Sequence, residues 1–247
     1  MNYEIVGLCE TGLKRTINQD AVFWSKSQDA VISVVADGIG GHNHGEVASN
    51  LIKQTVSKCW NMFLQNSQYQ DFRAMITLLK SELEKANQKL FQECSSAGIC
   101  GSTFVLLFIF HNQYGILYAG DSRVYLKKGF SVSQITIDEV WENQQNLSQE
   151  MRKNLLHSNR GKLVNAFGSE ADLHMRMLMN ELKGGELFLL CSDGLYKMCP
   201  DKQIHGAMNK ARRSVEGMRV ALLELKEQIE KAGAKDNFSI ILIKASR

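Results

Sequence analysis

The sequence predicts an α+β fold, a four-layer αββα sandwich in which two antiparallel sheets pack face to face and helices lie outside. Two observations indicate it. Helical patterns occur in consecutive blocks and do not alternate with strands, and short apolar runs follow one another with turn residues between them. The 247 residues include one proline and no linker-like stretch, so we expect a single domain over residues 1–247.

The first half of the chain predicts strands followed by two long helices. Strands are expected at 3–8, 21–24 and 30–36. Apolar residues that recur at helical spacing then indicate helices over 47–64 and 72–90. Two helices in succession can cover one outer face of the sandwich.

The second half predicts more antiparallel strands and a final helix. The runs "STFVLLFIF", "YGILYAG" and "RVYLKKG" are separated by "HNQ" and "GDS", which is typical of an antiparallel meander. Later strands are expected at 172–178, 186–191 and 237–243. A helix is expected over 214–231, where apolar residues recur every three or four positions.

Charge and cysteine content exclude some partners and indicate a compartment. The formal net charge is +3 with both signs interspersed, so we expect no nucleic-acid partner and no membrane surface. Six cysteines without a Cys-x-x-Cys pair are typical of a reduced, intracellular protein. The N-terminus has no leader pattern, and the longest apolar run, at 104–110, is too short to span a bilayer. We therefore expect a cytoplasmic monomer.

Four aspartates share one context, the end of an apolar strand beside a small or turn residue. They are Asp37 in "VVADGIGG", Asp121 in "YAGDSRVY", Asp193 in "LLCSDGLY" and Asp236 in "AKDNFSII". Because Asp-Gly and Gly-Asp pairs are common in turns, any one of them can be a turn residue alone. Strand ends gather at one rim of a sandwich, however, and like charges brought together need cations between them. The four together predict a metal site.

The residue types at this rim favour Mg²⁺ or Mn²⁺. Carboxylate oxygens, water and a backbone carbonyl exposed at a glycine are ligands for hard divalent ions. His42 and His44 have neither the spacing nor a partner cysteine for a zinc site. Gly38 lacks a Cβ, so its carbonyl can approach an ion closely. Asp37, at the centre of the glycine stretch, could bridge two ions.

Six motifs carry a resemblance to a known family. "GLKRTINQDA", "VVADGIGGHNHGEVAS", "GSTFVLL", "YAGDSRVY", "GELFLLCSDGL" and "KDNFSIILI" follow the order and approximate spacing of the type 2C (PPM) metal-dependent serine/threonine protein phosphatases, most closely the bacterial branch. The resemblance extends from about residue 3 to residue 244. It implies an enzyme of signal transduction that dephosphorylates phosphoserine and phosphothreonine, with phosphorylated proteins, a cognate kinase and its substrates as partners.

The resemblance also implies a metal-ligand set. Asp37 would bridge a dinuclear Mn²⁺ or Mg²⁺ centre, and Gly38 would donate its carbonyl. Asp193 and Asp236 would ligate one of the two ions, and Asp121 would share a weakly held third ion with Asp193. Two divalent ions among three carboxylates leave a positive site, which attracts a phosphate monoester. A water bridging the ions would then attack the phosphorus in line.

Three further residues are assigned around these ligands. Arg15 matches the arginine that holds the substrate phosphate in the family, and Asp20 would lie behind the ligands, next to Gln19 in place of a common glutamate. His42 is the candidate catalytic acid for the leaving serine alkoxide, because it follows Gly41 on the metal loop. Alternatively, His42 packs under that loop or orients the substrate.

The segment between Thr136 and Gly168 departs from the family pattern. It keeps Asp138 of the usual aspartate-histidine pair but has Glu139 in place of the histidine, and the segment is shortened. Ser102 and Thr103 in "GST" fit the family pattern. Substrate contacts are therefore expected to differ from those of relatives, whereas no predicted metal aspartate is substituted.

The sequence leaves one alternative function open and excludes another. A phosphatase-like regulatory or phosphoprotein-binding module with weak turnover is the alternative, although loss of turnover is usually accompanied by substituted metal aspartates. A nucleotide phosphate loop is excluded because no Lys-Ser or Lys-Thr pair follows the glycines of "GIGGHNHG".

Overall fold

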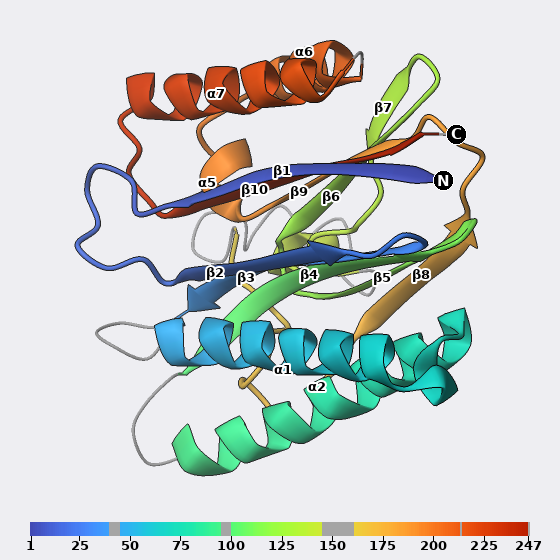
Figure 1. Cartoon of the computed structure of the whole chain (residues 1–247). Helices are drawn as coiled ribbons and strands as arrows, with labels where there is room; N and C mark the ends of the chain where they lie inside the picture. Colours follow the sequence, from blue (N-terminus) through green and yellow to red (C-terminus); the bar gives the residue numbers. More distant parts are fainter. Residues whose placement is uncertain (40–44, 95–99, 145–160, 213, 247) are drawn as a thin grey trace.

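The computed structural model describes residues 1–39, 45–94, 100–144, 161–212 and 214–246. In this part of the chain, two five-stranded antiparallel sheets pack face to face and helices cover both outer faces (Figure 1). The predicted four-layer αββα sandwich is confirmed. None of the described helices is both long enough and apolar enough to cross a membrane.

The first sheet has the strand order β1-β10-β9-β6-β7. Its strands are β1 (Asn2–Glu10), β6 (Arg123–Lys128), β7 (Ser131–Gln134), β9 (Leu187–Cys191) and β10 (Phe238–Ser246). The helices α6 (Asp201–Ala211) and α7 (Val215–Lys231) cover its outer face (Figure 1). The short helix α5 (Asp193–Tyr196) follows β9 directly.

The second sheet has the strand order β2-β3-β4-β5-β8. Its strands are β2 (Asp20–Lys26), β3 (Ala30–Ile39), β4 (Gly101–Phe110), β5 (Gln113–Ala119) and β8 (Arg176–Glu181). The helices α1 (Gly45–Gln65) and α2 (Phe72–Cys94) cover its outer face (Figure 1). Two 3₁₀ turns, η1 (Ser67–Tyr69) and η2 (Trp141–Asn143), lie in the connections.

The core is divided into three layers, one between the sheets and one under each helix pair. β4 contributes to two of them, which explains why its sequence is continuously apolar. Phe104, Leu106 and Phe108 pack toward α1 and α2, whereas Val105 and Leu107 face the first sheet. A strand buried on both faces has no polar position to alternate with.

Most of the predicted elements are found within a few residues. The predicted meander is confirmed for β4 and β5, which pair antiparallel, but it is wrong at the next turn. β5 and β6 are consecutive yet belong to different sheets, and β6 pairs with β9 and β7. The turn between them starts at Gly120, whose φ is +97°, and a Cβ there would lie 2.5 Å from a methyl carbon of Thr103. Because glycine tolerates both the backbone angle and the close approach, the chain can cross between the sheets here.

Three smaller differences concern single elements. The strand predicted at 172–178 begins later, as β8 at Arg176. β7 was not predicted, since its four residues "SVSQ" carry little apolar pattern. α6 was not predicted either, although it begins directly after Pro200, a position that favours a helix start.

The sheet–sheet layer can be tested at Phe188 in β9. This side chain is fully buried, and its ring packs edge-on against Tyr114 with 5.0 Å between ring centroids. We expect Phe188→Ala to lower the free energy of unfolding by about 3–5 kcal/mol, because the truncated side chain leaves a cavity. Urea denaturation followed by circular dichroism measures the change.

Phe130→Ala is the matched control, since Phe130 is 99% exposed. Its loss is expected to change the free energy of unfolding by less than about 0.5 kcal/mol. Similar losses in both variants would contradict the packing of the two sheets against each other.

Candidate metal centre

The four predicted aspartates gather at one rim of the sandwich, and they come from both sheets. Asp37 lies near the end of β3, and Asp121 lies in the turn that crosses between the sheets. Asp193 begins α5 directly after β9, and Asp236 stands two residues before β10. All four line one pocket of about 220 Å³. The structure therefore brings together the carboxylates that the sequence pattern singled out.

Asp37 is the pocket carboxylate whose side chain has neither a hydrogen-bond partner nor an ion-pair partner among the described residues. No described residue donates a hydrogen bond to its side-chain oxygens. Burial raises the pKa of Asp37 well above its usual range, and the negative charges of Asp20, Asp193, Asp121 and Asp236 raise it further. A carboxylate that is partly buried among like charges is a site where a cation is stabilising.

Asp20 lies behind the pocket and joins the two sheets. It is the register partner of Asp37 across β2 and β3. Its Oδ2 accepts hydrogen bonds from the hydroxyls of Ser192 and Ser239, each at 2.7 Å, whereas its buried Oδ1 has no hydrogen-bond partner. Burial raises the pKa of Asp20 to about 7, although the two serine hydroxyls partly oppose the shift. This position fits the predicted place behind the ligands.

Asp121 is held by a tyrosine that sequence reasoning missed. The Tyr196 hydroxyl donates to Asp121 Oδ2 at 2.9 Å and lies 3.1 Å from the Asp121 carbonyl oxygen. The hydroxyls of Thr103 and Ser122 hydrogen-bond each other at 2.7 Å and brace the same turn. Burial raises the pKa of Asp121 to about 6, and the charge of Asp193 raises it further. The bond from Tyr196 thus links α5 to the crossing turn.

Two cations of the protein pair with the outer carboxylates. Arg15 contacts Asp236 through Nε at 2.9 Å and Nη2 at 3.0 Å, so the arginine predicted to hold phosphate is engaged with a predicted metal ligand. Lys197 forms an ion pair with Asp193. Lys197 was not among the predicted residues, although a lysine four residues after an aspartate in a helical turn is a recognisable signal.

Gly38 is required by packing as well as by any ligand role. A Cβ at this position would lie 2.4 Å from the carbonyl oxygen of Gly45 and 2.7 Å from that of Gln19. The Gly38 amide donates to the Gln19 carbonyl at 3.1 Å. The backbones of β3, α1 and the segment before β2 therefore approach one another more closely than any side chain would allow.

Asn237 fixes the segment that carries Arg15. Its side-chain amide donates to the carbonyls of Thr11 at 2.8 Å and Ile17 at 3.0 Å, and its Oδ1 accepts from the Gln19 amide at 2.9 Å. The sequence motif "KDNFSIILI" contained this asparagine, but its partners are far away in the sequence and could not be inferred. Asn237 thereby sets where Arg15 meets Asp236.

The donors at the rim fit hard divalent cations, although they are not arranged as a ready-made cage. Within the described ranges, no three Asp, Glu, His or Cys side chains lie close enough together to hold one ion. Four carboxylates and two cations, Arg15 and Lys197, line the pocket, so its formal charge is −2 when every group is ionised. The oxygen-only donors and the unneutralised Asp37 suit Mg²⁺ or Mn²⁺. His42 and His44 lie outside the described residues.

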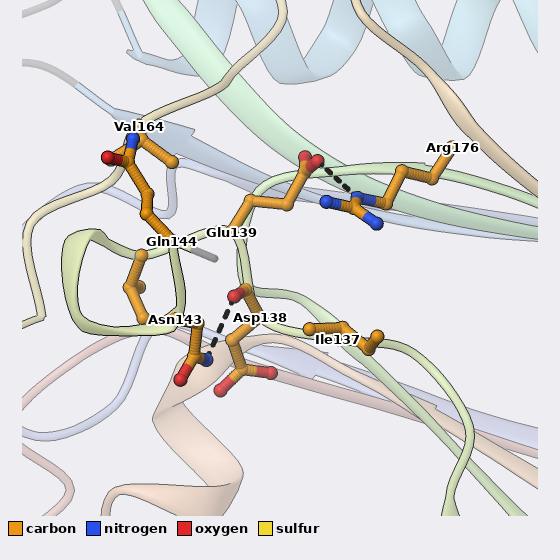
Figure 2. Close-up of a pocket in the computed structure, with 8 residues that line it drawn as sticks. Ile137, Asp138, Glu139, Asn143, Gln144, Val164 and Arg176 are labelled. Atoms are coloured by element: carbon orange, nitrogen blue, oxygen red, sulfur yellow. Dashed lines mark hydrogen bonds and ion pairs between the residues drawn. The ribbon is translucent and has the colours of Figure 1, made fainter. Parts of the chain in front are cut away.

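A second pocket, of about 360 Å³, adjoins the departure at residues 138 and 139 (Figure 2). Glu139 lines it and is nearly buried. Its Oε2 accepts from the Gly120 amide at 2.9 Å and from Asn165 Nδ2 at 2.6 Å, and its Oε1 accepts from Arg176 Nε at 2.7 Å. Glu139 therefore holds the turn that presents Asp121. Of the predicted departure, residues 145–160 lie outside the described part of the chain.

Comparison with protein families and curated proteins gives consistent matches. The family model described as Protein phosphatase 2C matches residues 13–231. The serine/threonine phosphatase stp of Listeria welshimeri is 26% identical over 242 residues, which cover 95% of this chain and 92% of the relative. The protein phosphatase PhpP of Streptococcus pneumoniae is 26% identical over 249 residues, which cover 97% and 96%.

Solved structures agree with the fold. PppA, described as a key regulatory component of T6SS in Pseudomonas aeruginosa, superposes with a TM-score of 0.82 at 27% identity, covering 99% of this chain and 98% of that one. The catalytic domain of the serine threonine protein phosphatase PstP, in complex with two manganese ions, has a TM-score of 0.75 at 22% identity and covers 99% of each chain.

The role of Asn237 in fixing the Arg15 segment can be tested by truncation. We expect Asn237→Ala to lower the free energy of unfolding by about 1–3 kcal/mol, because it removes three hydrogen bonds and leaves backbone groups without partners. Hydrogen exchange measured by mass spectrometry should also become faster in peptides covering residues 11–19. Asn180→Ala is the control, since its exposed side chain bonds only the adjacent Glu181 amide. Unchanged exchange at residues 11–19 in Asn237→Ala would contradict this role.

Proposed function

The chain belongs to the protein phosphatase 2C family, and from this premise we propose that it hydrolyses phosphoserine and phosphothreonine in proteins at the rim pocket. The observation that carries the proposal is the convergence of four carboxylates from both sheets around Asp37, whose side chain has no hydrogen-bond or ion-pair partner among the described residues. Phosphatases of this family depend on metal ions, and the pocket offers the oxygen donors that such ions take.

The metal ligands proposed are those that line the pocket. Asp37, the Gly38 carbonyl, Asp193 and Asp236 would hold two Mn²⁺ or Mg²⁺ ions, and Asp121 would share a weaker third ion with Asp193. The two manganese ions in the structure of the PstP catalytic domain support Mn²⁺ as the first ion to test. When bound, the ions supply positive charge beside the phosphoryl oxygens and lower the pKa of water.

Charge explains why this pocket needs metal ions before it can take a phosphate. With every group ionised, its lining has a formal charge of −2, which repels a phosphate monoester that is itself dianionic near neutral pH. Two divalent ions would reverse the sign of the pocket. Metal loading and substrate binding are therefore expected to be coupled in this order.

Arg15 and Tyr196 have separate jobs in this proposal. Arg15 lines the pocket with its side chain half-exposed, and its fork-shaped guanidinium can hold two phosphate oxygens at once. Tyr196 orients Asp121 through its hydroxyl. The proton for the leaving serine or threonine is assigned to His42, which lies outside the described residues.

The biological setting is proposed from composition. The interspersed charges and six cysteines without a paired motif support a cytoplasmic monomer, with residues 1–247 acting as one catalytic domain. None of the described cysteines whose state the structure gives forms a disulfide bond. A serine/threonine kinase and the proteins that it phosphorylates are the proposed partners.

The competing function is a phosphoprotein-binding module with little turnover. Hydrolysis of p-nitrophenyl phosphate and of a phosphothreonine peptide, with Mn²⁺ and with excess chelator, separates the two. The phosphatase is expected to hydrolyse both substrates only when Mn²⁺ is present. Peptide binding without hydrolysis at saturating Mn²⁺ would favour the module.

The metal assignment is tested by removing single carboxylates. Asp193→Asn and Asp236→Asn are expected to lower kcat by at least about 100-fold, because each removes a charged ligand from ions that stabilise the transition state. Circular dichroism should show an unchanged fold, and calorimetry should show weaker Mn²⁺ binding. Asp172→Asn, which changes an exposed aspartate outside the carboxylate pocket, is the control and should behave as wild type.

Asp121→Asn extends the same series to the third ion. We expect tight Mn²⁺ binding to persist in calorimetry while kcat falls, because an ion shared by two carboxylates is held more weakly than the central pair. Near-normal kcat at saturating Mn²⁺ would instead mean that Asp121 only shapes its turn, which asparagine does about as well.

Arg15→Ala is expected to raise KM for a phosphopeptide by about tenfold and to lower kcat less, because charge-assisted hydrogen bonds to phosphate form before the chemical step. Steady-state kinetics measure both parameters, and Arg15→Lys should recover part of the lost affinity. A lower kcat with unchanged KM would assign Arg15 to holding Asp236 and not to the substrate.

A further inference from the structure

The second pocket presents a guanidinium at an apolar wall. Arg176 begins β8 and lines the pocket together with Ile137 and Val164, which are 54% and 38% exposed. Its volume, about 360 Å³, is at the lower end of the range for ligand sites and is enough for one amino-acid side chain and the adjoining backbone.

The two carboxylates in the pocket wall are already engaged. The Asp138 side chain is 13% exposed, and its two oxygens accept three hydrogen bonds from Arg123 and one from Gln134. The Glu139 side chain is 8% exposed, and both of its oxygens accept hydrogen bonds as described above. Neither acid has the exposure to receive a basic side chain. A cationic occupant is therefore disfavoured.

Arg176 is the charged group that remains available. Its side chain is 52% exposed, and only Nε is bonded, to Glu139. Figure 2 shows its two terminal nitrogens free of any drawn interaction, and no described residue accepts a hydrogen bond from them. Two parallel N–H donors of this kind match the two oxygens of a carboxylate.

The pocket lies next to the candidate metal centre, and the two share no lining residue. Val140, in its wall, forms a β-bridge with Leu163, which lines the carboxylate pocket. Glu139 contacts both sides, since it binds Arg176 and also the amide of Gly120 next to Asp121. Because the two pockets are neighbours, a residue a few positions away from a phosphoresidue in the metal centre could extend to Arg176.

We propose that the second pocket binds an aspartate or glutamate side chain of the phosphoprotein substrate, with Arg176 as the residue that determines this specificity. The aliphatic stem of the acid packs on Ile137 and Val164, and its carboxylate meets the terminal nitrogens of Arg176. This inference rests on the proposed phosphatase activity and names the sequence class that the enzyme selects.

The test uses pairs of phosphothreonine peptides in a neutral host sequence. The members of a pair differ only in glutamate or glutamine at one position, and each of the four positions on either side of the phosphothreonine is examined in turn. At one of them, wild-type kcat/KM is expected to be about tenfold higher for glutamate, the scale of one charge-assisted hydrogen-bonded pair. Arg176→Gln should bring that ratio close to one, and Arg176→Lys should leave an intermediate ratio.

Arg219→Gln is the matched control. It removes the same charge from an exposed site on α7, outside both pockets, and should leave the peptide ratio unchanged. If Arg219→Gln lowered the glutamate-to-glutamine ratio of kcat/KM as much as Arg176→Gln does, the preference would come from overall charge. That result would overturn the proposed role of the pocket. Thermal melting of each variant shows whether it is folded.

Three further outcomes overturn the proposal. The first is a wild-type enzyme that hydrolyses both members of every pair equally, which leaves the phosphatase function intact. The second is an Arg176→Gln enzyme that loses the same factor on both peptides and on p-nitrophenyl phosphate, since Arg176 would then act only through Glu139 on the Asp121 turn. The third is a wild type that hydrolyses none of these substrates with Mn²⁺, which removes the proposed function as well.

Discussion

The buried carboxylate of Asp20 is the constraint on which the rest of the rim depends. It belongs to the second sheet, yet its hydrogen-bond donors belong to the first: Ser192 follows the end of β9, and Ser239 lies near the start of β10. Asp37 is its register partner, and Asp193 follows Ser192 directly. One acid therefore sets the separation of carboxylates that approach from opposite sheets. Burying it is costly, as its raised pKa indicates, and the two hydroxyls offset only part of that cost.

The electrostatics of the rim divide the carboxylates into two groups. Asp236 and Asp193 pair with Arg15 and Lys197, so the protein itself neutralises the outer acids. Asp37 has no such partner, and the surrounding charges raise its pKa. A cation entering the pocket thus gains most at Asp37, where a bridging ligand was predicted. The two paired cations reduce, but do not remove, the repulsion among the carboxylates, since like charges this close destabilise the folded chain.

Sequence patterns predicted the layers and the rim but not the connections between them. The position of the four pocket aspartates at strand ends predicted that they lie close together, because the ends of neighbouring strands meet at one rim of the sandwich. The predicted meander was correct for β4 and β5 but wrong for β6. Nothing in "YAGDSRVY" distinguishes a hairpin from a turn that changes sheet, and the close approach of Gly120 to Thr103 is visible only in the structure. Lys197 was detectable from its spacing. Asn237 and Tyr196 were not, because their partners are between 75 and 226 residues away in the sequence.

Glu139, which stands where the family pattern has a histidine, affects two places: the turn that carries Asp121 and the second pocket. Its Oε2 holds the Gly120 amide, which fixes the turn of Asp121, and its Oε1 holds Arg176 in the second pocket. A histidine has two separate ring nitrogens and, when neutral, accepts a hydrogen bond at only one of them. It could not accept from both partners without losing one. The carboxylate at position 139 accepts from both, and its pairing with Arg176 holds a guanidinium of β8 in the pocket next to the candidate metal centre. Replacement of one residue under the Asp121 turn thus accounts for the chemistry of the neighbouring surface.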